Sequence, residues 1–167
     1  MSSSARAATR SQVIVAVGLL LVLHFYIRPR VFDGPYAPDF VLIALILFAL
    51  RNGPGAGAVA GFLVGLANDA LVPARFGAAM LAHTLVGYLA AWSRAIFFAD
   101  NVLVNAGFLF FGCWLRDLIV LLASGLAAQG VLSTLFIDMP LRGLSTAVAG
   151  TVLLIAFRQL FAVRLDQ

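Results

Sequence analysis

The chain has 167 residues and a formal net charge of +4, and 63% of its residues are hydrophobic while only 11% are charged. Soluble domains are about half apolar and a quarter charged, so this composition excludes an ordinary soluble domain and indicates a membrane protein. The sequence has no basic stripe with interleaved aromatic residues, which argues against a nucleic-acid interface, and its single cysteine, Cys113, excludes an internal disulfide.

Six apolar segments follow one another along the chain, and we predict an all-α bundle of six transmembrane helices in one membrane domain, residues 1–167. The first segment lacks a small-residue cleavage site, so we expect a retained signal anchor. Residues 131–137 are too few to span and should lie at the interface or lengthen the final helix. The predicted helices cover about residues 13–27, 38–51, 54–72, 78–92, 102–123 and 143–161.

The arginines predict the orientation of the bundle. With the N-terminus inside, six arginines fall on the cytoplasmic side and four outside, so the positive-inside rule favours both ends in the cytoplasm. This orientation gathers the ionisable groups in the outer halves of the helices: His24, Asp39, Asp69, His83, Arg116 and Asp117.

Charges at membrane depth usually face the bundle interior and have partners. Arg116 and Asp117 are adjacent and point about 100° apart on a helix, which disfavours a pair between them. We therefore expect Arg116 to pair with Asp69. Asp69 has two other interpretations, as a marker of the helix end or as a cap for the segment after Pro73. His83, alone on an apolar helix, is expected to be a hydrogen-bonded core residue.

The third segment carries small residues at a fixed spacing. Every fourth position is a glycine and the next step is an aspartate: Gly53, Gly57, Gly61, Gly65 and Asp69. Four-residue spacing aligns positions on one ridge of a helix, and bare glycines let a neighbouring backbone approach closely. We predict that this ridge packs within the bundle rather than against another protein.

Catalytic motifs are missing from the sequence. It contains neither an HExxH zinc motif nor a GxSxG nucleophile elbow, and a chain without lysine cannot form a Walker loop. We expect a protein that is not an enzyme and that uses no cofactor and no metal.

Residues 36 to about 95 resemble the MreD family of rod shape-determining membrane proteins. The resemblance lies in three features in order: Pro38-Asp39 opening a hydrophobic helix, the pattern Gly57-xxx-Gly61-Phe62-xx-Gly65-Leu66-xx-Asp69, and Phe76-Gly77, where the family usually has Leu-Gly. With Arg116 from the charge argument, the candidate structural or interaction residues are Pro38, Asp39, Gly57, Gly61, Gly65, Asp69, Gly77 and Arg116.

The resemblance implies a multi-pass scaffold subunit of the cell-elongation complex in the bacterial cytoplasmic membrane. Its implied partners are an MreC-like protein, a RodA-type glycosyltransferase with its class B penicillin-binding transpeptidase, indirectly the MreB filament, and membrane lipid. The implied fold is similar to the substrate-binding subunits of energy-coupling-factor transporters, so a small-molecule transporter subunit is the alternative. Such subunits carry an Ala-xxx-Ala ridge on the first helix, whereas here Ala16 is followed four residues on by Leu20, which favours the scaffold.

Overall fold

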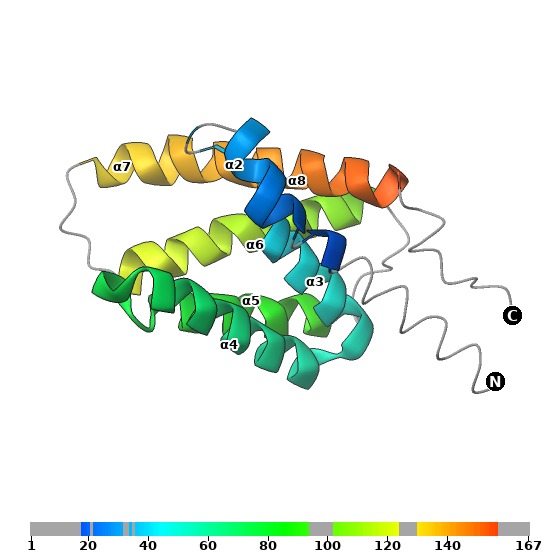
Figure 1. Cartoon of the computed structure of the whole chain (residues 1–167), viewed down its shortest axis with the longest axis horizontal. Helices are drawn as coiled ribbons and strands as arrows, with labels where there is room; N and C mark the ends of the chain where they lie inside the picture. Colours follow the sequence, from blue (N-terminus) through cyan, green and yellow to red (C-terminus); the bar gives the residue numbers. More distant parts are fainter. Residues whose placement is uncertain are drawn as a thin grey trace, which may run out of the picture.

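The computed structural model describes residues 18–20, 22–31, 34, 36–93, 102–123 and 130–156, and these residues form helices joined by turns. Helices α4, α5, α6 and α8 run lengthwise through the molecule, and α3 lies between them (Figure 1). Six helical stretches are present in this part of the chain, as predicted. Their bounds are 18–31 (without residue 21), α3 Phe40–Asn52, α4 Pro54–Leu71, α5 Ala78–Ser93, α6 Val102–Ala123 and Val131–Ala156.

The N-terminal helix ends later than predicted. It contains a π-helical turn, η1 (Leu23–Ile27), and continues as α2 (Arg28–Val31) instead of ending at Ile27. The predicted residues 13–17 lie outside the described part of the chain. Leu20 points into the core, whereas Phe25 and Tyr26 are exposed.

The last helix begins twelve residues before its predicted start at Gly143, so that boundary was wrong. It consists of α7 (Val131–Ser133), a second π-helical turn η3 (Thr134–Asp138) and α8 (Met139–Ala156). Residues 131–137 therefore lengthen the final helix, one of the two alternatives for this segment. The predicted end, residues 157–161, lies outside the described residues.

Both π-helical turns have the same physical cause. A proline follows two residues after each turn, Pro29 after η1 and Pro140 after η3. A proline in a helix removes one hydrogen bond, and its ring collides with the carbonyl four residues earlier. Those carbonyls belong to Phe25 and Phe136, inside the two π turns. The wider turn accommodates the proline. It is closed by an i→i−5 bond, from the N–H of Arg28 to the Leu23 carbonyl in η1 and from the N–H of Met139 to the Thr134 carbonyl in η3.

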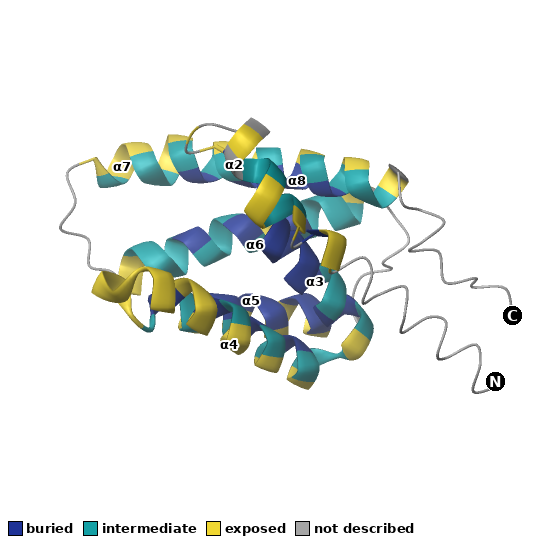
Figure 2. Ribbon diagram, viewed as in Figure 1, coloured by how far each residue is buried: buried dark blue, intermediate teal, exposed yellow. Residues whose placement is uncertain are grey.

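Helix α3 is the core of the protein. Nine of its thirteen residues are buried, and they cover all sides of the helix: Phe40, Val41, Leu42, Ile43, Ala44, Leu45, Ile46, Ala49 and Leu50. Figure 2 shows this concentration of buried residues on α3, while the outer faces of α4 and α7 are exposed. Helix α3 contacts α4, α5, α6 and α8, so its surroundings are protein rather than solvent or lipid.

The lengths of the helices set the position of Asp39. Helix α3 is about 20 Å long and α4 about 27 Å, and the two are joined by a tight turn at Gly53, whose φ is +90°. The start of α3 therefore lies inside the bundle, short of the far end of α4. Within the described residues, two helices are long and apolar enough to cross a membrane, Leu103–Ala123 and Val131–Ile155.

Candidate functional site: a buried charge network at the start of α3

Asp39 caps α3 and lies at the centre of a buried group of charged side chains. Its Oδ1 accepts a 3.0 Å hydrogen bond from the N–H of Leu42, and its own N–H donates to Thr146 Oγ1 of α8 at 3.2 Å. Pro38 disfavours helical geometry in the residue before it, so the helix cannot extend backwards. Sequence and packing together place the start of α3 at this position, two residues after the predicted start.

Arg116 of α6 is the cation that pairs with Asp39. Its Nη2 lies 2.9 Å from Asp39 Oδ2, and its Nε lies 3.0 Å from Asp117 Oδ1. The second contact is an electrostatic attraction without hydrogen-bond geometry. The three side chains are only 8–14% exposed, and charges at that burial are stable only when they are paired.

The network continues from Arg116 to α8. Asp117 Oδ2 accepts a long hydrogen bond of 3.5 Å from Arg142 Nη1. On the other side, Nδ1 of His24 in η1 lies 3.7 Å from Asp39 Oδ1. These four side chains, in the spatial order Arg142, Asp117, Arg116 and Asp39, alternate between positive and negative charge and join α8, α6 and α3. Buried charges require this kind of pairing.

Neutral side chains complete the network. Thr146, which is fully buried, accepts the N–H of Asp39, and its Oγ1 lies 3.7 Å from the Cys113 sulfur. The same sulfur lies 3.7 Å from Arg116 Nη2. Cys113 therefore acts as a polarisable neighbour of the guanidinium. Its burial and the absence of another cysteine argue against a redox role.

The segment before Asp39 is tied to the last helix by polar contacts. The hydroxyl of Tyr36 donates to Asp138 Oδ1 at 3.1 Å, and the hydroxyl of Ser145 donates to the Tyr36 carbonyl at 2.6 Å. The hydrogen bond to the Asp138 carboxylate raises the pKa of Tyr36 above its usual value. These contacts hold the entry to α3 against η3 and α8.

Two expectations about Arg116 are wrong. The predicted pair with Asp69 does not form, because Asp39 occupies that position beside the guanidinium. The expected separation of Arg116 from Asp117 fails because the long arginine side chain bends back along its own helix until Nε meets the neighbouring carboxylate. The direction of a Cα–Cβ bond constrains a short side chain more than a long, flexible one.

Asp69 instead caps α5, which was the alternative interpretation of this residue. Its Oδ2 accepts the N–H groups of Gly77 and Met80 at 2.9 Å each, and its Oδ1 accepts the N–H of Ala79 at 3.1 Å. The carboxylate thus bonds three backbone donors at the start of a helix, where a negative charge is also favoured by the helix dipole. Gly77 has a φ of +99°, a conformation for which glycine is the suitable residue.

The glycine ridge packs inside the bundle, as predicted. Gly57, Gly61 and Gly65 are buried, and a Cβ on any of them would lie within 3.0 Å of α5 backbone atoms. The opposing atoms belong to Gly87, His83, Thr84, Ala79 and Met80. Gly53 does not belong to the ridge, because it forms the turn between α3 and α4.

His83 is a buried core histidine, which confirms its predicted role. Its Nδ1 lies 2.8 Å from the carbonyl of Ala79, one turn earlier on α5. The side chain also lies close enough to Arg116 and Asp39 for electrostatic interaction, so it forms the α5 side of the network.

The network is suited to holding helices together rather than to catalysis or metal binding. Its carboxylates are already occupied by arginines and backbone donors, and the described residues contain no group of three or more His, Cys, Asp or Glu placed to hold a metal ion. The sequence placed Arg142 on the outer side, at the approach to the last helix, but did not identify it or Thr146 as members of the network. The four-residue spacing of these two positions was a signal, since it places both on one face of the last helix.

A helical bundle with an apolar exterior and its charges paired internally defines an integral membrane protein with a structural core. The sequence model of the family described as rod shape-determining protein MreD matches residues 6–164. The chain therefore belongs to the MreD family, a family of membrane proteins that determine cell shape, as its sequence indicated. Comparisons with curated proteins and with solved structures gave no match.

Proposed function

We propose that this protein is a non-enzymatic scaffold subunit of the bacterial cell-elongation complex, which binds an MreC-like protein within the membrane and supports lateral peptidoglycan synthesis. The observation that carries the proposal is the family match, which extends over nearly the whole chain. Further proposed partners are a RodA-type glycosyltransferase with its class B penicillin-binding transpeptidase and, indirectly, the MreB filament.

The distribution of side chains supports binding within the membrane. Large apolar residues are exposed on the outer faces of the helices, among them Phe62 and Leu63 of α4, Leu81 of α5 and Phe111 of α6. Such faces are covered by lipid or by the transmembrane helices of other proteins. The charged network, in contrast, is directed inward and offers little to a soluble partner.

The proposed topology is a multi-pass protein of the cytoplasmic membrane, with six crossings and both termini inside. The arginine distribution supports this orientation. Cys113 is buried, and a Cys113→Ser background leaves no other thiol. In that background, Asp33→Cys and Gln129→Cys should react with an impermeant maleimide outside the cell, and Asn52→Cys should not. External labelling at position 52 would contradict the topology.

Co-purification tests the function itself. The tagged full-length chain, extracted in mild detergent, should bring down an MreC-like protein and a RodA-type glycosyltransferase, identified by mass spectrometry. An unrelated multi-pass protein with the same tag serves as the control. Recovery of an ATPase pair with a transmembrane coupling subunit would instead assign the chain to the small-molecule transporters and refute the scaffold.

A further inference from the structure

The inner face of the N-terminal helix carries two buried side-chain nitrogens, one imidazole and one guanidinium, that have no hydrogen-bond partner among the described residues. His24 and Arg28 are four residues apart across the π-helical turn, so they lie on one face of this helix. His24 Nδ1 and Arg28 Nε are buried and have no hydrogen-bond partner in the described part of the chain. Buried donors are normally satisfied, so each unsatisfied one requires an explanation.

The neighbouring carboxylate does not provide that explanation. Oδ1 of Asp39 already accepts the N–H of Leu42, and Oδ2 is held by Arg116. His24 Nδ1 is 3.7 Å from Oδ1, too far for a hydrogen bond. For Arg28, the described residues supply no carboxylate within ion-pair distance.

The surroundings of the two donors are electropositive. Arg28 and Arg116 both lie close enough to His24 to repel a positive charge on its ring, whereas Asp39 attracts one. Asp117 and Arg142, farther along the network, are paired with each other. His83 of α5 also lies close enough to Asp39 for electrostatic interaction. An unpaired guanidinium in a membrane bundle is costly, and a mobile anion would compensate it.

The side chains of the cluster keep a small exposed surface. The side chains of His24, Arg116 and Asp39 are 16%, 14% and 12% exposed, and Arg28 is partly exposed. Within the described residues, the N-terminal helix contacts mainly α3. His24 Nδ1 and Arg28 Nε are themselves covered, so a group of a few atoms reaches them when this helix moves slightly away from α3.

We propose that His24 and Arg28, supported by Arg116, bind one oxyanion, and that its source is the phosphate of an anionic lipid headgroup. A guanidinium offers a planar set of N–H donors that matches phosphate oxygens, and charge-assisted hydrogen bonds to phosphate are stronger than neutral ones. A lipid phosphate is an oxyanion available beside any helix of a membrane protein, and its acyl chains would lie along the exposed Phe25 next to His24.

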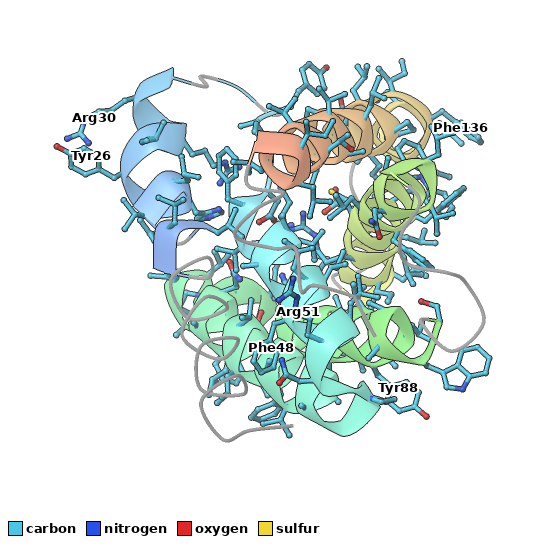
Figure 3. The ribbon with its side chains drawn as sticks, turned by 90° about the vertical axis from the view of Figure 1, so that its right-hand side faces the viewer. Tyr26, Arg30, Phe48, Arg51, Tyr88 and Phe136 are labelled. Atoms are coloured by element: carbon cyan, nitrogen blue, oxygen red, sulfur yellow. The ribbon has the colours of Figure 1, made fainter. Side chains whose placement is uncertain are left out.

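Arg30 provides a matched control, because it is a neighbouring arginine on the opposite face of the helix. Its guanidinium lies 3.7 Å from the centre of the Tyr26 ring, and its Nη1 donates to the Tyr26 carbonyl at 3.0 Å. Figure 3 shows both residues on the side of this helix that faces away from the bundle. Arg30→Gln removes the same charge as Arg28→Gln without touching the proposed site.

The test is the melting temperature of the full-length chain in an uncharged detergent, with phosphatidylglycerol, phosphatidylcholine or sodium phosphate added. Phosphatidylglycerol should raise the melting temperature of the wild type and of Arg30→Gln by several degrees, and phosphatidylcholine should have little effect. Arg28→Gln and His24→Gln should lose most of the shift. An equal shift in Arg28→Gln, or an equal effect of phosphatidylcholine, would overturn the proposal.

Two further measurements identify the source of the oxyanion and keep the test valid if Arg28→Gln does not fold. If sodium phosphate gives the shift in the wild type but not in Arg28→Gln, the lipid source is refuted and a free oxyanion takes its place. If Arg28→Gln does not fold, native mass spectrometry of wild type and Arg28→Lys should show fewer bound phosphatidylglycerol molecules in the variant. Equal numbers would overturn the proposal in that case.

Discussion

Two halves of this bundle are held together by opposite means. The α4–α5 hairpin relies on missing side chains: three buried glycines bring two backbones together, and one carboxylate caps the second helix. The group formed by α3, α6 and α8 relies on side chains that cross the helices, with Asp39, Arg116, Asp117 and Arg142 in an alternating network. The α4–α5 hairpin should therefore be sensitive to substitutions that add side-chain atoms, and the charge network to substitutions that remove a charge.

The largest expected loss of stability is in the α4–α5 hairpin, at the glycine ridge. Gly61→Leu places a side chain where the carbonyl of His83 lies, and even the Cβ would overlap this backbone. Overpacking typically costs about 1–3 kcal/mol and occasionally more, and Gly61→Leu should exceed this range because the opposing atoms belong to the backbone of α5. We expect loss of monodisperse protein in size-exclusion chromatography. Gly55→Leu on the same helix is the control, since nothing lies within 4 Å of a Cβ there. Equal behaviour of the two variants would refute the ridge.

The next effect is on the charge network. Arg116→Met leaves Asp39 without its cation, and stranding one member of a buried pair costs about 3–5 kcal/mol. Asp39→Ser removes the charge but keeps a capping hydroxyl. The double variant should therefore be less destabilised than the sum of the single variants, by about 0.5–3 kcal/mol. Thermal melting in detergent measures the cycle. Simple additivity would mean that the two charges do not interact.

A third experiment separates the two halves. Asp69→Ala leaves three N–H groups at the start of α5 without their acceptor, at an expected cost of about 1–3 kcal/mol. Because Asp69 shares no contact with Arg116, its effect should add to that of Arg116→Met within about 0.5 kcal/mol. A large coupling between the two substitutions would show that the halves are not independent.

The smallest effect concerns the contact between Tyr36 and Asp138 at the edge of the network. The pKa of Tyr36 is raised in the folded state, so the neutral phenol is favoured there over the phenolate. The stabilisation is complete below the pKa of the unfolded tyrosine, about 10, and is lost as the pH rises through the higher folded value. The melting temperature should fall over this range in the wild type and less steeply in Tyr36→Phe. Parallel pH profiles would contradict a role for the hydroxyl.

The sequence predicted features that lie within a single helix better than it predicted the charge pairs between helices. Glycine spacing was sufficient to predict the ridge, because four-residue periodicity is a property of one helix, and the capping role of Asp69 was foreseen as an alternative. The partner of Arg116 was not predictable in this way, because three helices far apart in the chain determine which carboxylate reaches it. The start of the last helix was misplaced because residues 131–137 are too few to span a membrane by themselves, whereas the π-helical turn η3 joins them to α8 in one continuous helix.

The central position of α3 has a consequence for the order of assembly during synthesis. This helix emerges from the ribosome before α5, α6 and α8, yet these later helices form most of its surroundings. At 13 residues it is too short to span a bilayer securely on its own, and Asp39 has no cation until Arg116 has been made. Helix α3 therefore reaches its final position only after most of the chain has been inserted, when α5, α6 and α8 have packed around it.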